Sequence, residues 1–235
     1  MKNMLLASTS TLHNQPYLEY LLLELEKLYS GASQIIFIPY ARPGGISHDD
    51  YTEKARGAFQ NIGIELKGLH EFTNEKEALV QAEGIFTGGG NTFLLVRTLY
   101  SLGLIQTLKE VVSSGTSYLG TSAGTNIAGL SMKTTNDMPI VYPPSFNTLG
   151  LVPFNINPHY LDPDPSSTHQ GETRETRIKE FHEFNNVPVV GLREGSWLAV
   201  RGKEVSLKGN FSARVFQPNS APYEIEPGAS LKELN

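Results

Sequence analysis

The sequence predicts an α/β fold with a mostly parallel sheet, helices on both faces and an antiparallel hairpin at one edge. Two observations lead to this prediction. Short apolar runs alternate with amphipathic stretches over most of the chain, and the C-terminal part changes to two adjacent strand-like runs. A β-α-β order implies parallel strands, because each crossover helix returns the chain to the end of the sheet at which the preceding strand began. The length of 235 residues suits a single domain, residues 1–235, with a well-buried core.

Short apolar runs predict the strands. Each run is rich in aliphatic side chains and is bounded by polar or glycine-containing segments. Near the C-terminus, residues 197–200 and 204–207 flank the polar turn Arg201-Gly202-Lys203, which is typical of an antiparallel hairpin. The other predicted strands are residues 4–7, 34–38, 65–69, 84–87, 117–120 and 187–192.

Amphipathic stretches predict helices between these strands. The clearest covers residues 17–30, where leucines recur at helical spacing on one face and charged residues occupy the other. Pro16 suits the first turn of this helix, and Gly31 suits the position just past its end. The other predicted helices are residues 49–61 and residues 91–109, the latter broken at Gly103.

The composition limits the function classes to which the chain can belong. It contains no cysteine, which excludes disulfides, thiolate metal sites and cysteine nucleophiles. A formal charge of −5 provides no broad basic surface for a nucleic acid. Because no run of about 18 apolar residues and no secretory signal occurs, we expect a cytoplasmic protein without a membrane partner. We also expect neither a metal nor a cofactor, and either a monomer or a homodimer.

A serine motif provides the first candidate for chemistry. Residues 120–124, Gly-Thr-Ser-Ala-Gly, fit the pattern G-x-S-x-G, follow a predicted strand and precede the helix-compatible residues 125–130. Such a turn strains the backbone of the nucleophile, and the flanking glycines remove the Cβ atoms that would clash. We therefore predict that Ser122 is a nucleophile and that the Ala123 amide points toward the oxyanion.

Three consecutive glycines, residues 88–90, lie at the end of another predicted strand. Glycines let backbone amides approach a ligand closely, so these residues offer a second oxyanion donor. The alternatives are a phosphate-binding turn and a tight connection from strand to helix. The lysine that follows in nucleotide-binding loops is missing.

A serine hydroxyl is a poor nucleophile unless a base lies within hydrogen-bond reach. His159 is the favoured base, because it follows the alternating apolar run 152–157 and Pro158, which places it at the end of a strand. His169 is the alternative, in the long Pro-, Asn- and Asp-rich segment 134–170. The remaining histidines, which we expect at the surface, are His13, His48, His70 and His182.

The group that orients the base has two candidates. Glu194 lies just beyond the predicted strand 187–192, at its carboxyl end. Asp137 would restore the chain order Ser, Asp, His of the α/β-hydrolases. Asp162 and Asp164 are closer to His159, but they suit turn formation better. Because triads are recognised by geometry rather than by chain order, both Glu194 and Asp137 remain open.

Six motifs spread in order over nearly the whole chain together resemble peptidase E, the aspartyl dipeptidase family. They are GGGNT at 88–92, GTSAGTN at 120–126, TTNDMP at 134–139, NPH at 157–159, GETRE at 171–175 and LREGS at 192–196. The resemblance implies a serine peptidase that removes the N-terminal aspartate from Asp-X dipeptides. It also implies a flavodoxin-like fold similar to that of class I glutamine amidotransferases.

The resemblance further implies a role for particular residues. One departure from the family's bacterial pattern is Thr121, where a tryptophan is expected, and this change would reshape the wall of the pocket. The implied roles are Ser122 as nucleophile, His159 as base, Glu194 as acid, and the amides of Gly90 and Ala123 as oxyanion donors.

Selectivity for aspartate requires a cation for the substrate carboxylate, and a guanidinium binds a carboxylate with bidentate geometry. Arg174 is the candidate, because it lies in the first turn of a predicted helix, residues 171–184, where the macrodipole disfavours a cation. A surface ion pair with Glu175 or Glu180 is the alternative. Asp137 and Asn91 are candidates for binding the substrate ammonium or carbonyl.

Two other functions fit the same residues. A cyanophycinase-like hydrolase would use the same triad but cleave β-aspartyl-arginine, and it would need an anionic subsite for the arginine. A non-catalytic binding homologue would keep the pocket without the reaction.

Overall fold

The computed structural model describes residues 1–234 apart from 165, 167, 169 and 170. Its larger sheet has seven strands in the order β3-β2-β4-β5-β1-β8-β9. The first five of these are parallel, and β8 and β9 add an antiparallel hairpin at the edge. The predicted fold class and the predicted hairpin are thereby confirmed. The strands are β1 (Asn3–Ala7), β2 (Gln34–Ile38), β3 (Glu65–Gly68), β4 (Gly84–Thr87), β5 (Ser117–Thr121), β8 (Ser196–Arg201) and β9 (Glu204–Gly209).

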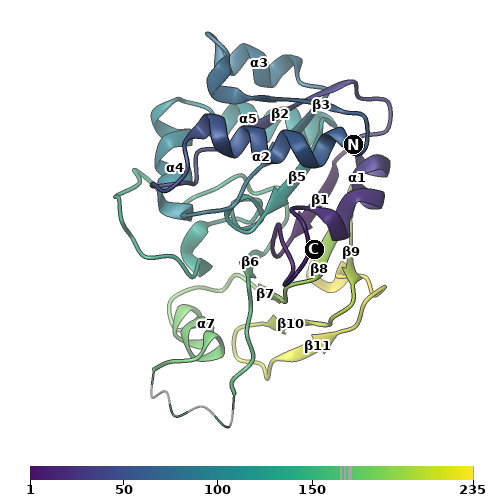
Figure 1. The fold of residues 1–235 in the computed structure, drawn as a ribbon. Coiled ribbons are helices and arrows are strands. Elements are labelled where there is room, and N and C mark those ends of the chain that lie inside the picture. The colour runs from purple at the N-terminus through teal and green to yellow at the C-terminus, as the bar shows by residue number, and fades with distance from the viewer. Residues whose placement is uncertain (165, 167, 169–170, 235) are drawn as a thin grey trace.

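Helices cover both faces of this sheet (Figure 1). Successive side chains of a strand point to opposite faces. In β1, Leu5 and Ala7 pack with α1 and α2, whereas Met4 and Leu6 pack with α3, α4 and α5. The sheet therefore separates two apolar clusters. The helices are α1 (Leu22–Leu28), α2 (His48–Gln60), α3 (Glu75–Gln81), α4 (Thr92–Ser101) and α5 (Ile105–Ser114).

One prediction about the helices is wrong, and one helix was missed. The helix predicted over 17–30 begins late, because Leu18 is buried with a left-handed φ of 60° and donates its N–H to the Ser10 carbonyl at 2.8 Å. A short 3-10 turn, Glu19–Leu21, then leads into α1. Helix α3 was not predicted, because it is short and buries few apolar residues. The predicted break at Gly103 is confirmed, since α4 ends and α5 begins on either side of it.

A second sheet lies beside the first, below it in Figure 1. The run 187–192 was expected in the main sheet but forms β7 of this second one, parallel to β6 and antiparallel to β10. One face of the second sheet joins the core of the main sheet through Ile156, Val190 and Val215. Its strands, in order β11-β10-β7-β6, are β6 (Asn155–Pro158), β7 (Val189–Leu192), β10 (Ala213–Phe216) and β11 (Tyr223–Ile225).

Helix α7 (Arg174–His182) packs on the other face of the second sheet. The contact is small, because Ile178 is the one buried residue of the helix and packs with Val189 and Phe216. Since so few apolar side chains hold α7, charged contacts contribute to its position.

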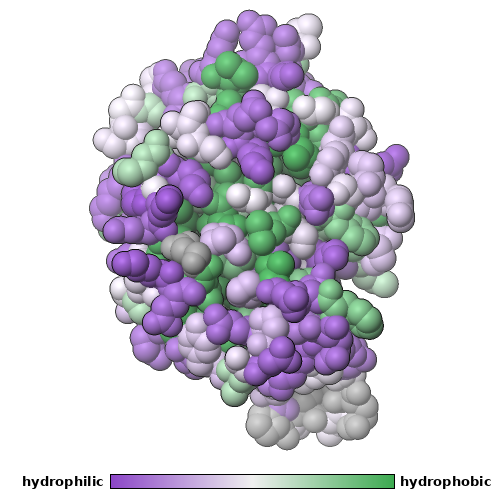
Figure 2. Space-filling view, turned by 180° about the vertical axis from the view of Figure 1, so that it is seen from behind, coloured by the Kyte–Doolittle hydropathy of each residue, from purple (hydrophilic) through white to green (hydrophobic). Residues whose placement is uncertain are grey.

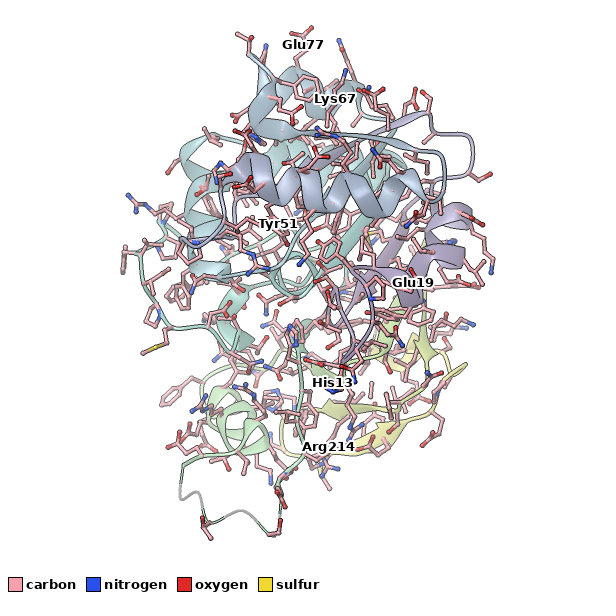
Figure 3. All side chains as sticks on the ribbon, in the orientation of Figure 1. His13, Glu19, Tyr51, Lys67, Glu77 and Arg214 are labelled. Carbon is pink, nitrogen blue, oxygen red and sulfur yellow. The ribbon has the colours of Figure 1, made fainter. Side chains whose placement is uncertain are left out.

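A network of charged side chains ties the second sheet to α7. Arg193 forms a bidentate pair with Asp162, with both N···O distances 2.8 Å, and a second pair with Glu224 at 2.8 and 3.1 Å. Arg214, labelled in the lower part of Figure 3, pairs with Glu224 at 3.1 Å and with Glu175 at 3.0 Å. Bidentate pairs of this kind restrict geometry as well as adding energy. The network therefore holds together the segments that follow β6 and β7.

The side of the molecule opposite to that of Figure 1 mixes polar and apolar side chains, with apolar surface gathered near its centre (Figure 2). In the part of the chain that the structure describes, none of the helices combines the length and apolarity of a membrane span.

The charged network predicts a pH dependence of stability. The hydrogen bond from Arg193 lowers the pKa of the Glu224 carboxyl from 4.5 to about 2. A depressed pKa contributes stability above the ordinary value that is lost as pH falls through the folded-state value. We therefore expect Glu224→Gln to lower the free energy of unfolding at pH 7, with a difference that shrinks between about pH 4.5 and 2. The effect should be modest, because the side chain is 34% exposed.

Urea unfolding over a pH series measures this difference. Glu226→Gln, at an exposed position shortly after β11, is the matched control and should leave stability unchanged at every pH. A loss for Glu224→Gln that stays constant down to pH 2 would contradict the prediction.

Candidate active site

The serine turn joins β5 to the short helix α6 (Ala123–Asn126). Ser122 has φ 53° and ψ −111°, a conformation that L-residues rarely adopt. A Cβ on Gly120 would lie 2.5 Å from the Gly124 carbonyl oxygen, and one on Gly124 would lie 2.2 Å from the Thr87 carbonyl oxygen. Neither position has room for a side chain, so the glycines of the motif are required by the close approach of β4, β5 and α6.

Hydrogen bonds hold this turn against the neighbouring strands. The Ser122 N–H donates to the Ala7 carbonyl at 3.2 Å, and the buried Thr125 hydroxyl lies 2.6 Å from the same oxygen. The Asn126 side chain donates to the Ile156 carbonyl at 2.9 Å. The turn is therefore linked to the end of β1 in the main sheet and to β6 in the second sheet.

The structure brings Ser122, His159 and Glu194 together. His159 directly follows β6, and its Nε2 lies 2.9 Å from Ser122 Oγ. Glu194 lies two residues beyond β7, and its Oε1 is 2.5 Å from His159 Nδ1. The three side chains thus come from the carboxyl ends of three strands in two sheets. The alternative base, His169, lies outside the described residues.

Ser8 is a polar residue of this region that the sequence analysis missed. It directly follows β1 and is fully buried. Its hydroxyl accepts the His159 backbone N–H at 2.8 Å and donates to the Leu192 carbonyl at 2.7 Å. Since His159 has a φ of 53°, this contact supports a strained backbone. The one signal in the sequence that could have indicated Ser8 is a polar residue directly after the predicted strand 4–7.

The glycine turn at residues 88–90 lies against the serine. A Cβ on Gly89 would lie 2.9 Å from Ser122 Cβ, and one on Gly90, which has φ 144°, would lie 2.3 Å from the Ala41 carbonyl oxygen. Within the described part of the chain, the amides of Gly90 and Ala123 make no hydrogen bond. One N–H group without a partner therefore directly follows Ser122, and the other belongs to the turn that lies against it.

Asp137 shares a small depression of about 30 Å³ with Ser122 and His159. Its Oδ2 accepts the Thr92 backbone N–H at 2.7 Å and the Thr135 hydroxyl at 2.9 Å. The carboxylate that faces the imidazole is Glu194, so Asp137 is not in the position that a triad acid would occupy.

Asn91 caps helix α4. Its Oδ1 accepts the Leu94 N–H at 3.1 Å, and its Nδ2 donates to the Met138 carbonyl at 2.9 Å. Both polar atoms of the side chain are therefore used inside the protein. Asn91 holds the segment that carries Asp137 rather than extending into the depression.

Arg174 is the first residue of α7 and is partly buried. Burial lowers the pKa of its guanidinium, whereas the charge of Asp137 acts in the opposite direction, so these two groups are close enough to interact. Arg174 makes no ion pair or hydrogen bond with another residue that the structure describes. Glu175, its alternative partner, pairs instead with Lys179 at 2.7 Å and Arg214 at 3.0 Å.

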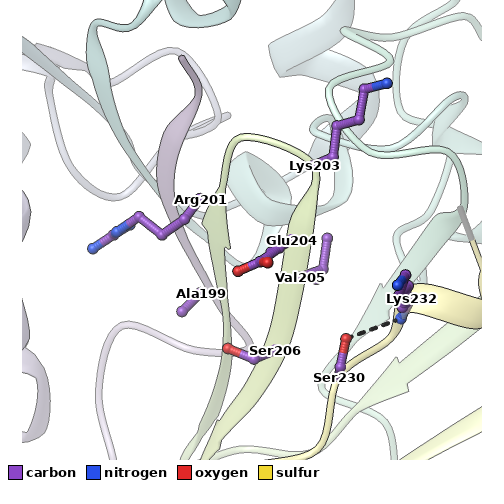
Figure 4. Close-up of a pocket in the computed structure, with 8 residues that line it drawn as sticks. All are labelled: Ala199, Arg201, Lys203, Glu204, Val205, Ser206, Ser230 and Lys232. Carbon is purple, nitrogen blue, oxygen red and sulfur yellow. Dashed lines mark hydrogen bonds between the residues drawn. The ribbon is translucent and has the colours of Figure 1, made fainter.

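A larger cavity, of about 550 Å³, lies beside the β8–β9 hairpin (Figure 4). It is lined by Arg201, which pairs with Asn3 at the start of β1, whereas Ser122 follows the strand end that pairs with Ala7. The cavity therefore lies at the other end of the strands. Arg201 and Lys203 point in different directions around it, and we assign it no part in the chemistry at Ser122.

Two of the other histidines, His48 and His70, lie close together. His70, expected at the surface, has a side chain only 18% exposed and pairs with Asp49 at 2.8 Å. Its ring centroid lies 5.4 Å from that of His48. No group of three or more His, Asp or Glu side chains among the described residues is arranged to hold a metal ion.

The packing at the serine turn predicts the effect of one added methyl group. Gly124→Ala should lower the free energy of unfolding by about 1–3 kcal/mol, because its Cβ would overlap the Thr87 carbonyl. Gly57→Ala is the matched control within α2, where nothing lies within 4 Å of the added Cβ. This variant should stabilise the protein by about 0.5–1 kcal/mol. Urea unfolding measures both, and equal effects would contradict the prediction.

Comparisons with known proteins agree with this architecture. Residues 4–208 match the family model described as Peptidase family S51. A protein named "Peptidase E" from Streptomyces coelicolor is 51% identical over 99% of this chain and 94% of its own length. A protein named "Probable alpha-aspartyl dipeptidase" from Drosophila melanogaster is 46% identical over 99% of this chain and 97% of its own.

A solved structure of a peptidase from an acI-B1 Actinobacterium shares the fold, with a TM-score of 0.71 at 19% identity over 98% of this chain and 96% of that one. The family match and the near full-length relatives together show that this chain belongs to peptidase family S51.

Proposed function

We propose that this chain is a serine peptidase that hydrolyses dipeptides with an N-terminal aspartate. The observation that carries the proposal is the hydrogen-bonded series Ser122, His159 and Glu194, with distances of 2.9 and 2.5 Å. The names of the relatives, peptidase E and alpha-aspartyl dipeptidase, support the same substrate class.

The proposed reaction proceeds through an acyl-enzyme. His159 Nε2 takes the proton of the Ser122 hydroxyl as Oγ attacks the scissile carbonyl carbon. The imidazolium then donates that proton to the departing amine, and a water molecule, activated by the same imidazole, hydrolyses the ester. Glu194 accepts the Nδ1–H, which fixes the tautomer of the base and stabilises its positive form.

The negative charge that develops on the carbonyl oxygen requires donors already in place. We assign this role to the amides of Gly90 and Ala123, which have no partner within the described chain. Ala123 directly follows Ser122, and Gly90 belongs to the turn that lies against it. Ala123 is also the first residue of α6. Donors that need no rearrangement during the reaction stabilise the transition state more than the ground state.

Two opposite charges suit the two ionic groups of an N-terminal aspartate. Arg174 would bind the side-chain carboxylate of the substrate, and Asp137 would bind its α-ammonium. Asp137 uses Oδ2 for Thr92 and Thr135, while its Oδ1 has no hydrogen bond to the part of the protein described. The charge of Asp137 acts on the Arg174 guanidinium, which supports their being close enough to serve one small substrate.

Removing the proposed nucleophile should abolish turnover. We expect Ser122→Ala to reduce kcat for Asp-Leu by at least about a thousandfold, because the proposed acyl-enzyme forms on its Oγ. Ser113→Ala, on the exposed face of α5, is the matched control and should keep wild-type activity. Unchanged hydrolysis by a folded Ser122→Ala variant would overturn the proposal.

The same residue can be tested by covalent labelling. An aryl phosphonate should lose its phenolate as Ser122 Oγ bonds to phosphorus, and mass spectrometry should find the adduct on the wild type but not on Ser122→Ala. A wild type that neither labels nor hydrolyses any dipeptide would favour the non-catalytic binding protein.

Removing the proposed carboxylate ligand should change specificity. We expect Arg174→Gln to lower kcat/KM for Asp-Leu by about 100-fold or more while changing Asn-Leu little, because only Asp-Leu offers a carboxylate to the guanidinium. Steady-state kinetics on both substrates gives the Asp/Asn ratio.

Arg177→Gln is the control for Arg174→Gln, since Arg177 lies on the same helix and is exposed. Its Asp/Asn ratio should match that of the wild type. A ratio that Arg174→Gln leaves intact would remove Arg174 from the site. Faster hydrolysis of β-aspartyl-arginine than of Asp-Leu by the wild type would favour a cyanophycinase-like enzyme instead.

A further inference from the structure

Tyr51 makes a polar contact with the glycine turn, residues 88–90. It belongs to α2, where it is labelled in Figure 3, and it is only 1% exposed. Its hydroxyl donates to the Gly89 carbonyl at 3.1 Å. Tyr51 belongs to none of the sequence motifs around the serine, yet it makes a direct polar contact with the turn that lies against Ser122.

The Gly89 carbonyl that Tyr51 contacts belongs to the same peptide group as the Gly90 N–H. The Gly89 carbonyl and the Gly90 N–H are the two ends of one planar peptide, and no described peptide bond is cis. In a trans peptide the C=O and N–H point in opposite directions. A donor that fixes the direction of the carbonyl therefore fixes the direction of the N–H, and it also polarises the N–H by cooperative hydrogen bonding.

The turn has little freedom to adopt another arrangement. The Asn91 N–H donates to the Ala41 carbonyl at 2.7 Å, and the same carbonyl oxygen lies 2.3 Å from where a Gly90 Cβ would be. At the other end, a Cβ on Gly88 would lie 2.6 Å from the Tyr51 hydroxyl. The Tyr51 hydroxyl thus holds the Gly89–Gly90 peptide, and the Ala41 carbonyl holds the Gly90–Asn91 peptide that follows it.

Tyr51 is itself held in place. Its ring meets Phe37 edge to face, with centroids 4.9 Å apart, and the Arg42 guanidinium lies 4.9 Å from its centroid. The Tyr17 hydroxyl lies 3.5 Å from the Tyr51 hydroxyl. A ring confined on these sides presents its hydroxyl to Gly89 without a large entropic cost.

We propose that Tyr51 is a positioning residue for the oxyanion hole, which orients the Gly89–Gly90 peptide so that the Gly90 N–H points to the developing oxyanion. The proposal rests on the proposed function, because it requires the Gly90 amide to act as an oxyanion donor. Tyr51 touches no substrate atom in this scheme. Its effect should therefore appear in transition-state stabilisation and leave substrate binding and the ionisation of the base unchanged.

Tyr51→Phe tests the proposal, because it removes the donor and keeps the ring. We expect kcat for Asp-Leu to fall by about 10-fold to 100-fold. This decrease is no larger than the decrease in kcat expected when a direct oxyanion donor is removed. KM should change by less than about twofold, and the pH profile of kcat/KM should keep its shape. The rate of phosphonate labelling of Ser122 should fall in parallel, because the phosphoryl oxygen occupies the same hole.

Tyr29→Phe is the matched control. Tyr29 is 2% exposed, belongs to the same apolar cluster as Tyr51 and donates to the Ile85 carbonyl at 2.8 Å, away from the glycine turn. Each variant loses one buried hydroxyl with one backbone contact, so similar losses of unfolding free energy are expected. Only Tyr51→Phe should lose kcat.

Equal kcat values for the two variants would overturn the proposal, as would a change in KM or in the pH profile without a change in kcat. If Tyr51→Phe does not fold, 3-fluorotyrosine at position 51 keeps the ring and makes the hydroxyl a stronger donor. It should raise kcat, and an unchanged kcat would overturn the proposal. Failure of the proposed function would give a different result, because the wild type itself would then neither hydrolyse dipeptides nor react with the phosphonate.

Discussion

The close packing of the turn at Ser122 is the constraint on which the rest of the site depends. The backbone of β4, β5 and α6 approaches so closely that Gly120 and Gly124 have no space for a Cβ. Hydrogen bonds to the end of β1 then leave Ser122 in a strained conformation with its side chain beside the glycine turn. Because such strain persists only where the surroundings determine the backbone, the direction of the hydroxyl is set by the fold.

The groups around Ser122 come from two sheets whose relative position must be maintained. The main sheet supplies the serine and glycine turns, and the second sheet supplies His159 and Glu194. Ser8 connects them, since its hydroxyl bonds to both the His159 amide and the Leu192 carbonyl. On the outer side, Arg193 joins the segments that follow β6 and β7. A change in sheet packing would therefore alter the distance from imidazole to hydroxyl.

Much of the fold could be predicted from local sequence. The strands at 34–38 and 84–87 match the observed bounds, because a buried parallel strand is a continuous apolar run between polar segments. Local patterns failed where tertiary contacts dominate. Leu18 has helical spacing, but its burial and its bond to Ser10 hold it in a left-handed conformation. The run 187–192 is a strand as predicted, but its sheet partner depends on residues remote in sequence.

At the site, the sequence by itself determined the strained serine turn and the glycine turn, because both depend on where side chains are absent within a few consecutive residues. It also limited the base to His159 or His169 and the acid to Glu194 or Asp137, with His159 and Glu194 at predicted strand ends. Only the tertiary structure decided between Glu194 and Asp137 as the neighbour of the imidazole, placed Asn91 in a helix cap, and brought Ser8 and Tyr51 to the two turns. The reason is physical: a hydrogen bond depends on distances of a few ångströms between chain segments, and no local pattern of residues encodes them.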